Sequence, residues 1–316
     1  MKHTNHLILF SALLLIISVL VGCISLPPER FDTPIPDQEI VFASHDFTGF
    51  IHPDGSGLVK FVPALSQPRW GGKKANYLLW IGPWGKTFFT KDNDYIKECP
   101  RFWVWEMGSV PGTDDIIAVV RGGEDSEHLV RINFKWCRLV KDYLEETRDL
   151  ELGTNPAFEN FIVFSRTERK MNRPVKTEIV LLDTVTSELR VLKTFDITNN
   201  DIQSPYRAPT FSPEGKWIAY TDVNSIRLMR PDGTEDHELV NVKGWYRVAL
   251  FSWPPTASFS PDGQWIVFHR CPKGHCSVIW DVGPGRIYKV NVLTQKETML
   301  FDNGGNPVWR LRGSED

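Results

Sequence analysis

Two ten-residue stretches repeat along the chain, FSPEGKWIAY at 211–220 and FSPDGQWIVF at 259–268, and they align without gaps at an offset of 48 residues. A fixed period of this size indicates a solenoid or a propeller. In each copy a short strand ends at Ser-Pro, because proline cannot donate to a strand ladder. An acidic residue and a glycine then turn the chain into the next strand. The residues that define these turns are Pro213, Glu214, Gly215, Pro261, Asp262 and Gly263.

The repeat resembles the TolB-type, WD-like propeller motif, whose consensus reads F-S-P-D-G-x-x-I-A-F. In that frame, weaker copies of proline, any residue and an aromatic residue precede other β runs. They are Pro68-Arg69-Trp70, Pro100-Arg101-Phe102, Pro156-Ala157-Phe158, Pro209-Thr210-Phe211 and Pro307-Val308-Trp309. The copy at Ala257-Ser258-Phe259 lacks the proline. The resemblance therefore implies six inner strands. Second strands are predicted at 77–81, 115–121, 161–166, 217–222 and 265–270.

The two ends of the chain lack complementary pieces of a blade. The first β run, Ile40–Ala43, has no inner strand before it, and the last inner strand, around Val308–Leu311, has no strand after it. Pairing between them closes the ring and removes open sheet edges. The sequence thus predicts an all-β, six-bladed, TolB-like β-propeller over residues 39–312, with both chain ends in one blade. Six blades are favoured over seven, and a β-sandwich would explain neither the repeat nor the incomplete ends.

The N-terminal segment has the layout of a secretory signal. Lys2 precedes an apolar run from Leu7 to Val21 that is short for a membrane span. The ending Leu20-Val21-Gly22-Cys23 resembles the bacterial lipobox, in which the cysteine receives a diacylglyceryl group, and the two acyl chains suffice for stable anchoring. We expect a signal peptide over 1–22, lipidation at Cys23 and a proline-rich tether over 23–38. The alternative is an uncleaved signal anchor with an incidental cysteine.

These features predict where the protein resides. Ile24 follows the cysteine, whereas aspartate there commonly retains lipoproteins in the inner membrane. The resemblance therefore implies the outer membrane in a two-membrane cell, and otherwise the outer face of the cytoplasmic membrane. TolB proteins also carry an α/β domain ahead of the propeller, so the resemblance extends to the propeller alone. A formal charge of -3 argues against a nucleic-acid partner.

Four cysteines besides Cys23 suggest disulfides in an exported protein. Cys271 and Cys276 enclose a short loop, for which a local disulfide is favoured over a metal site that would include His275. Cys99 and Cys137 flank the third blade, and spacing leaves their pairing open. No metal site and no cofactor are predicted.

The sequence carries no catalytic motif: H-E-x-x-H, G-x-S-x-G, the P-loop and G-x-G-x-x-G are all absent. Aligning the second strands places Arg121, Arg166 and Arg270 in one column where the strands leave for loops. Three arginines around one rim could attract an anionic ligand or partner. They could equally be loop-edge charges paired with acids such as Glu124 or Glu168. Trp253 and the run Trp245-Tyr246-Arg247 suggest either a binding surface or inter-blade packing.

Three functions compete at this point. The leading hypothesis is a non-enzymatic scaffold, tethered to the membrane by lipid, that binds an envelope protein. A second is a small-molecule or glycan binder that uses the central channel and needs an open, polar or aromatic-lined pocket there. A third is a channel-site hydrolase or lyase, which needs a histidine or paired carboxylates with perturbed pKa values.

Overall fold

The computed structural model describes residues 37–311, except 45, 62–64, 66, 82–86, 92–96, 100, 123–125, 147, 172, 198–206, 223–224, 242–256 and 271–284. The predicted signal peptide, Cys23, the loop Cys271–Cys276 and the aromatic residues around Trp245 and Trp253 lie outside these ranges. Within them the chain forms strands β1 to β25 and no helix. No helix long and apolar enough to cross a bilayer occurs among the described residues.

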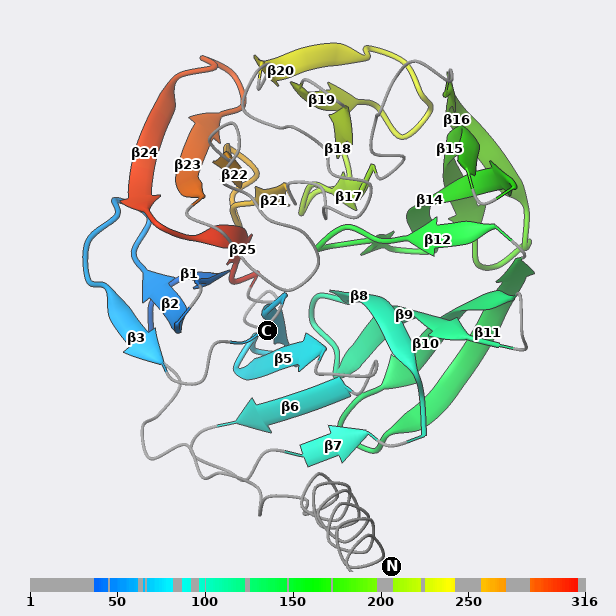
Figure 1. The fold of residues 1–316 in the computed structure, drawn as a ribbon, viewed down its shortest axis with the longest axis horizontal. Helices are drawn as coiled ribbons and strands as arrows, with labels where there is room; N and C mark the ends of the chain where they lie inside the picture. Colours follow the sequence, from blue (N-terminus) through cyan, green and yellow to red (C-terminus); the bar gives the residue numbers. More distant parts are fainter. Residues whose placement is uncertain are drawn as a thin grey trace, which may run out of the picture.

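The strands form six antiparallel sheets arranged as blades around a central axis (Figure 1). Blade one contains β25 (Gly305–Trp309), β1 (Ile40–Ala43), β2 (Thr48–Ile51) and β3 (Val59–Phe61). Blade two contains β4 (Arg69–Gly71), β5 (Tyr77–Ile81), β6 (Thr87–Lys91) and β7 (Lys97–Cys99). Blade three contains β8 (Val104–Ser109), β9 (Asp115–Arg121), β10 (Glu127–Asn133) and β11 (Arg138–Glu146).

Blade four contains β12 (Asp149–Glu151), β13 (Ala157–Phe158), β14 (Phe161–Lys170), β15 (Arg173–Asp183) and β16 (Leu189–Asp196). Blade five contains β17 (Thr210–Phe211), β18 (Ile218–Asp222), β19 (Ser225–Met229) and β20 (His237–Asn241). Blade six contains β21 (Ser258–Phe259), β22 (Trp265–Arg270), β23 (Arg286–Asn291) and β24 (Glu297–Asp302). In Figure 1, β21 and β25 lie near the axis, while β3, β7, β11, β16, β20 and β24 form the outer rim.

The predicted ring closure is confirmed. β25 pairs antiparallel with β1, with Trp309 opposite Ile40 and Val308 opposite Val41. The Arg310 N–H donates to the Glu39 carbonyl at 2.7 Å and extends this pairing. Blade one therefore combines the first and last strands of the described chain, as the incomplete ends of the sequence required.

The two repeat copies form the same tight turn. The Gly215 and Gly263 N–H groups donate to the carbonyls of Ser212 and Ser260, each at 2.9 Å, and both glycines have a φ of 68°. That backbone conformation is strained for residues with a Cβ. A Cβ on Gly215 would also come within 2.2 Å of the Phe158 ring, so this glycine allows blades four and five to approach closely.

Two blades differ from the prediction. The inner strand of blade three begins at Val104 rather than at Arg101-Phe102, and a register shift lies between Val104 and Glu106. The bulge adds a residue to the inner strand, and bulges of this kind re-aim side chains. In blade four the inner segment is divided into β12 and β13, which both pair with β14.

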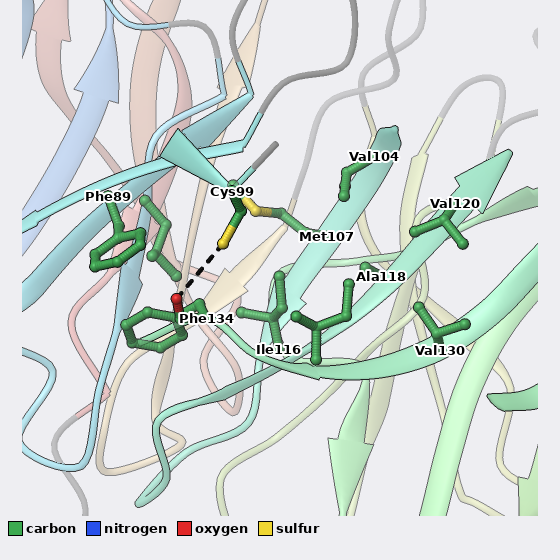
Figure 2. Close-up of a cluster of buried hydrophobic side chains, with 11 residues drawn as sticks. Phe89, Cys99, Val104, Met107, Ile116, Ala118, Val120, Val130 and Phe134 are labelled. Carbon is green, nitrogen blue, oxygen red and sulfur yellow. Dashed lines mark hydrogen bonds between the residues drawn. The ribbon is translucent and has the colours of Figure 1, made fainter. Parts of the chain in front are cut away.

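The hydrophobic core is divided into six clusters, and each lies between two neighbouring blades. Figure 2 shows the cluster between blades two and three, where Phe89 and Cys99 lie against Met107, Ile116 and Phe134. Cys99 is bonded to Cys137 in a disulfide, with a Cα–Cα distance of 5.4 Å. The bridge joins the outer strand β7 to the β10–β11 turn of the next blade. It therefore links blade two covalently to blade three.

Candidate binding face at the ends of the axis

The segments nearest the axis carry a repeated pattern of charged residue followed by a small or hydroxyl residue. Glu106 precedes Ser109 by three positions on β8, and Glu151 and Arg207 likewise precede Thr154 and Thr210. At about 3.3 Å per residue the two layers lie about 10 Å apart along the axis. We call the layer of Arg69, Glu106, Glu151 and Arg207 the charged end, and the layer that includes Ser109 and Thr154 the hydroxyl end.

Side chains of the charged end are almost completely buried. Arg69 and Arg207 are each 1% exposed, and Glu106 and Glu151 are each 5% exposed. The Glu151 carboxylate accepts hydrogen bonds from the backbone N–H of Arg207 at 2.7 Å and from the Ser165 hydroxyl at 3.1 Å. It thereby connects blade four to the segment that leads into blade five. Buried charges of this kind are tolerated only when they are paired and hydrogen-bonded.

Burial also shifts the ionisation of this layer. Burial raises the pKa of Glu106 well above its ordinary value, Glu151 raises it further, and Arg69 opposes the change. Burial raises the pKa of Glu151 to about 7, against hydrogen bonds that lower it. Burial lowers the pKa of Arg69 to about 10, and Glu106 opposes that shift. The arginine thus stays charged near neutral pH, while burial disfavours the ionised form of both carboxyl groups.

His269 lies at the same end of blade six. It is buried, and its Nδ1 accepts a hydrogen bond from the Asn306 N–H at 3.2 Å. Burial lowers the pKa of His269 to about 4. The ring is therefore neutral at physiological pH and acts as an acceptor that holds the start of β25.

The hydroxyl end encloses a small cavity. The residues that line it include Trp70, Trp309, Ser109, Thr154 and Ser258. The space is about 20 Å³, enough for one water-sized molecule. The Thr154 hydroxyl lies 3.2 Å from both the Thr210 hydroxyl and the Ala257 carbonyl. Hydrogen bonds here therefore join segments of blades four, five and six.

The three arginines of the predicted rim have different surroundings. Arg166 forms ion pairs with Glu178 at 2.8 Å and Glu146 at 3.2 Å. Arg270 pairs with Glu297 at 2.6 Å and also donates to the Asn241 carbonyl. Arg121 is exposed at the end of β9. The described partners of Arg166 and Arg270 are thus acids other than Glu124 and Glu168, the two that the sequence suggested.

A pair of tryptophans beside Arg121 was not predicted from the sequence. The rings of Trp103 and Trp105 are stacked, with centroids 6.4 Å apart and planes 10° from parallel. Their side chains are 48% and 38% exposed. The backbone N–H of Arg121 donates to the Trp103 carbonyl at 3.1 Å, so the end of β9 lies next to the pair. The alternation Trp-Val-Trp around Val104 could have indicated it. Successive residues of a strand face opposite sides, so a buried Val104 leaves both tryptophans on the exposed side.

Metal-ligand geometry is lacking in the described part of the chain, where no three His, Cys, Asp or Glu side chains converge as a metal site would require. The carboxylates at the charged end are instead accompanied by arginines. The charge of Arg69 lowers the pKa of Glu106, and the charge of Arg207 lowers that of Glu151.

No protein-family model matches the sequence, and no curated protein matches it. Solved structures do match. TolB from Acinetobacter baumannii has a TM-score of 0.60 at 12% identity, with 93% of this chain and 70% of that chain covered. A chain of a nidogen/laminin complex has a TM-score of 0.59 at 9% identity, with 86% of this chain and 98% of that chain covered. At such low identity the likeness concerns the fold alone: this chain is a six-bladed β-propeller with the architecture found in TolB.

Proposed function

We propose that this chain is a lipid-anchored, non-enzymatic binding protein of the cell envelope, which recognises a protein partner through the face around Trp103, Trp105 and Arg121. The observation that carries the proposal is the exposed, stacked tryptophan pair with an exposed arginine beside it. Tryptophan and arginine are the residue types most enriched at the energetic centres of protein interfaces. An exposed pair of large indoles in a soluble domain calls for such an explanation.

The position of the N-terminal strand supports this choice of face. Gln38 donates to the Gly57 carbonyl, and Ile40 pairs with Trp309 at the finish of β25. The chain therefore enters blade one at the hydroxyl end of the axis. The tryptophan pair lies at the opposite end, where β8 begins. A tether from Cys23 would hold the propeller from one side and leave this face available to a partner.

A channel binder of small molecules or glycans receives less support. The cavity among the described residues holds about one water molecule, whereas ligand pockets usually measure 300 Å³ or more. Next to this cavity, the Thr154 hydroxyl contacts the Thr210 hydroxyl and the Ala257 carbonyl of the neighbouring segments. A face, rather than the channel, is therefore the favoured place for recognition.

The hydrolase or lyase alternative would use Glu106 and Glu151, because both have raised pKa values and come from different blades. Their burial and the hydrogen bonds of Glu151 to the backbone instead favour a structural role. A catalytic pair must reach a substrate, and only 5% of each residue is exposed.

Affinity capture from intact cells tests the binding proposal. Full-length tagged protein should recover a specific envelope protein after crosslinking. The Trp103→Ala/Trp105→Ala variant should lose that protein by at least tenfold, while Trp136→Ala, which alters a 74% exposed tryptophan at the outer edge of the same blade, should retain it. Equal recovery by both variants, or repeated recovery of no protein by the wild type, would refute the proposal.

The anchor is tested separately by mass spectrometry of the mature N-terminus. We expect a diacylglyceryl group on Cys23 as the first residue, with Cys23→Ser released from the membrane fraction. An unmodified cysteine behind an intact leader would overturn the anchoring part and leave the binding face to be judged on the capture experiment.

A further inference from the structure

The most exposed apolar side chains of the described residues gather at one end of the propeller. The four largest exposed fractions are those of Trp136 at 74%, Val185 at 70%, Leu293 at 87% and Met171 at 98%. The first three lie in the β10–β11, β15–β16 and β23–β24 turns, each between the two outermost strands of a blade. We call these three residues the apolar rim. Single exposed apolar residues are common, but a shared position in three blades calls for an explanation.

The strand register places the apolar rim at the hydroxyl end of the axis. In blade three, Ser109 pairs with Ile116, and Ile116 pairs with Ile132 near the end of β10. The β10–β11 turn therefore lies on the side of Ser109. Blades four and six have the same strand directions, so their outermost turns lie at this end as well. Met171 lies in the β14–β15 turn at the charged end, because β14 runs past Glu151 before it reaches that turn.

The three turns are held by the same kind of hydrogen bond. In each, an asparagine or aspartate at the end of the strand accepts the backbone N–H of the apolar residue. The pairs are Asn133 with Trp136 at 3.1 Å, Asp183 with Val185 at 2.8 Å and Asn291 with Leu293 at 3.1 Å. Side-chain acceptors of this type fix a turn locally. The apolar side chains therefore project from defined turns.

The tether reaches the propeller at this same end. Residues 1–36 precede the described chain, and the proposed lipidation site Cys23 is among them. The first described strand begins at Ile40, opposite Trp309 at the hydroxyl end. With the lipid of Cys23 in the bilayer, the hydroxyl end is the end of the propeller that the tether brings nearest to the membrane.

We propose that the apolar rim rests in the interfacial layer of the bilayer that anchors the chain, an inference that rests on the proposed lipid anchor. Tryptophan is enriched at this layer, where its ring is apolar and its N–H reaches water. Exposed Lys135 and Arg138 beside Trp136 suit the phosphates of lipid headgroups. Blades three and six lie on opposite sides of the ring (Figure 1), so contacts from both orient the axis along the membrane normal. The contact is limited to these tips, because the outermost turn of blade five presents exposed Asp232.

Photo-crosslinking to lipid tests the rim in the full mature chain, reconstituted in vesicles of phosphatidylethanolamine and phosphatidylglycerol. A photoreactive residue replaces Trp136, Val185 or Leu293 in turn, and Met171 supplies the matched exposed control at the opposite end. Because all four side chains are exposed, the replacements should leave the fold intact. We expect mass spectrometry to find phospholipid adducts from each of the three rim positions and none from position 171.

Flotation of the same vesicles separates the rim from the lipid anchor. Protein that floats but gives no phospholipid adduct from the three rim positions, or gives as much from position 171, would overturn the rim contact and leave the anchor standing. Protein that does not float would overturn both. In intact cells, protein adducts in place of lipid adducts from the rim positions would identify a protein interface there and overturn the membrane contact.

Discussion

The two ends of the propeller axis are lined by different chemical groups. At the charged end, the buried residues Arg69, Glu106, Glu151 and Arg207 place charges of both signs near one another. At the hydroxyl end, Ser109, Thr154 and Ser258 surround a small cavity with neutral donors. The two ends therefore differ in their expected response to pH, because ionisable groups are buried at one end and neutral hydroxyl groups line the other.

Breaking the charged end should produce the largest loss. Arg69→Met removes the buried cation whose charge opposes the rise of the Glu106 pKa, and loss of a buried charged partner costs up to about 3–5 kcal/mol. The double variant Arg69→Met/Glu106→Gln should recover part of this loss. Urea unfolding gives the free energies. A loss no larger than that of Ser109→Ala, which removes one hydroxyl at the opposite end, would show that the charged end contributes no more to stability than the hydroxyl end.

His269 adds an acid sensitivity to the charged end. Its pKa is about 4 in the folded protein and 6.5 ordinarily, so the unfolded chain binds a proton first as pH falls. Stability attributable to this group is therefore intact above pH 6.5 and falls by about 3 kcal/mol by pH 4. His269→Gln should remove that portion of the acid loss. Unfolding curves of variant and wild type that stay parallel from pH 7 to 4 would contradict the assignment.

Glu151 should show the opposite dependence. Its pKa is raised from 4.5 to about 7 in the folded protein. Its contribution is therefore fully present below pH 4.5 and is lost, by about 3 kcal/mol or less, as pH rises through 7. The Glu151→Gln variant keeps an acceptor for the Arg207 N–H and should lack this decline. We expect the difference between variant and wild-type stability to grow from pH 4.5 to 7, and a constant difference would contradict the raised pKa.

The hydroxyl end should be less sensitive. Thr154→Val preserves shape and removes the hydroxyl that lies 3.2 Å from the Ala257 carbonyl. A loss of about 1 kcal/mol is expected, as for one ordinary hydrogen bond, with no dependence on pH between 4 and 7. Urea unfolding at both pH values measures it. A loss comparable to that of Arg69→Met would erase the contrast between the two ends.

Much of the fold could be predicted because the strands carry local signals. The predicted runs 40–43, 77–81, 115–121 and 265–270 coincide with β1, β5, β9 and β22. Their alternating or continuous apolar patterns and their flanking turns depend only on neighbouring residues. The ring closure followed from the incomplete blades at the two ends of the chain.

The axial chemistry could not be predicted in the same way. Arg69 and Arg207 stand in short segments beside prolines, and in sequence they are indistinguishable from loop charges. Their burial depends on blades that meet only after folding. The bulge at Trp105 likewise displaced the start of β8 from the predicted position, because the register of the strand is set by its pairing with β9. The Cys99–Cys137 bridge was an open possibility for the same reason.

The most direct test of the proposed binding face is site-specific photo-crosslinking in intact cells. A photoreactive residue would replace Arg101, which is exposed two positions before Trp103, or Leu293, which is 87% exposed in a turn of blade six. We predict a discrete adduct with an envelope protein from position 101 and none from position 293. An adduct from position 293 alone, or from neither position, would contradict recognition at the face around Trp103, Trp105 and Arg121.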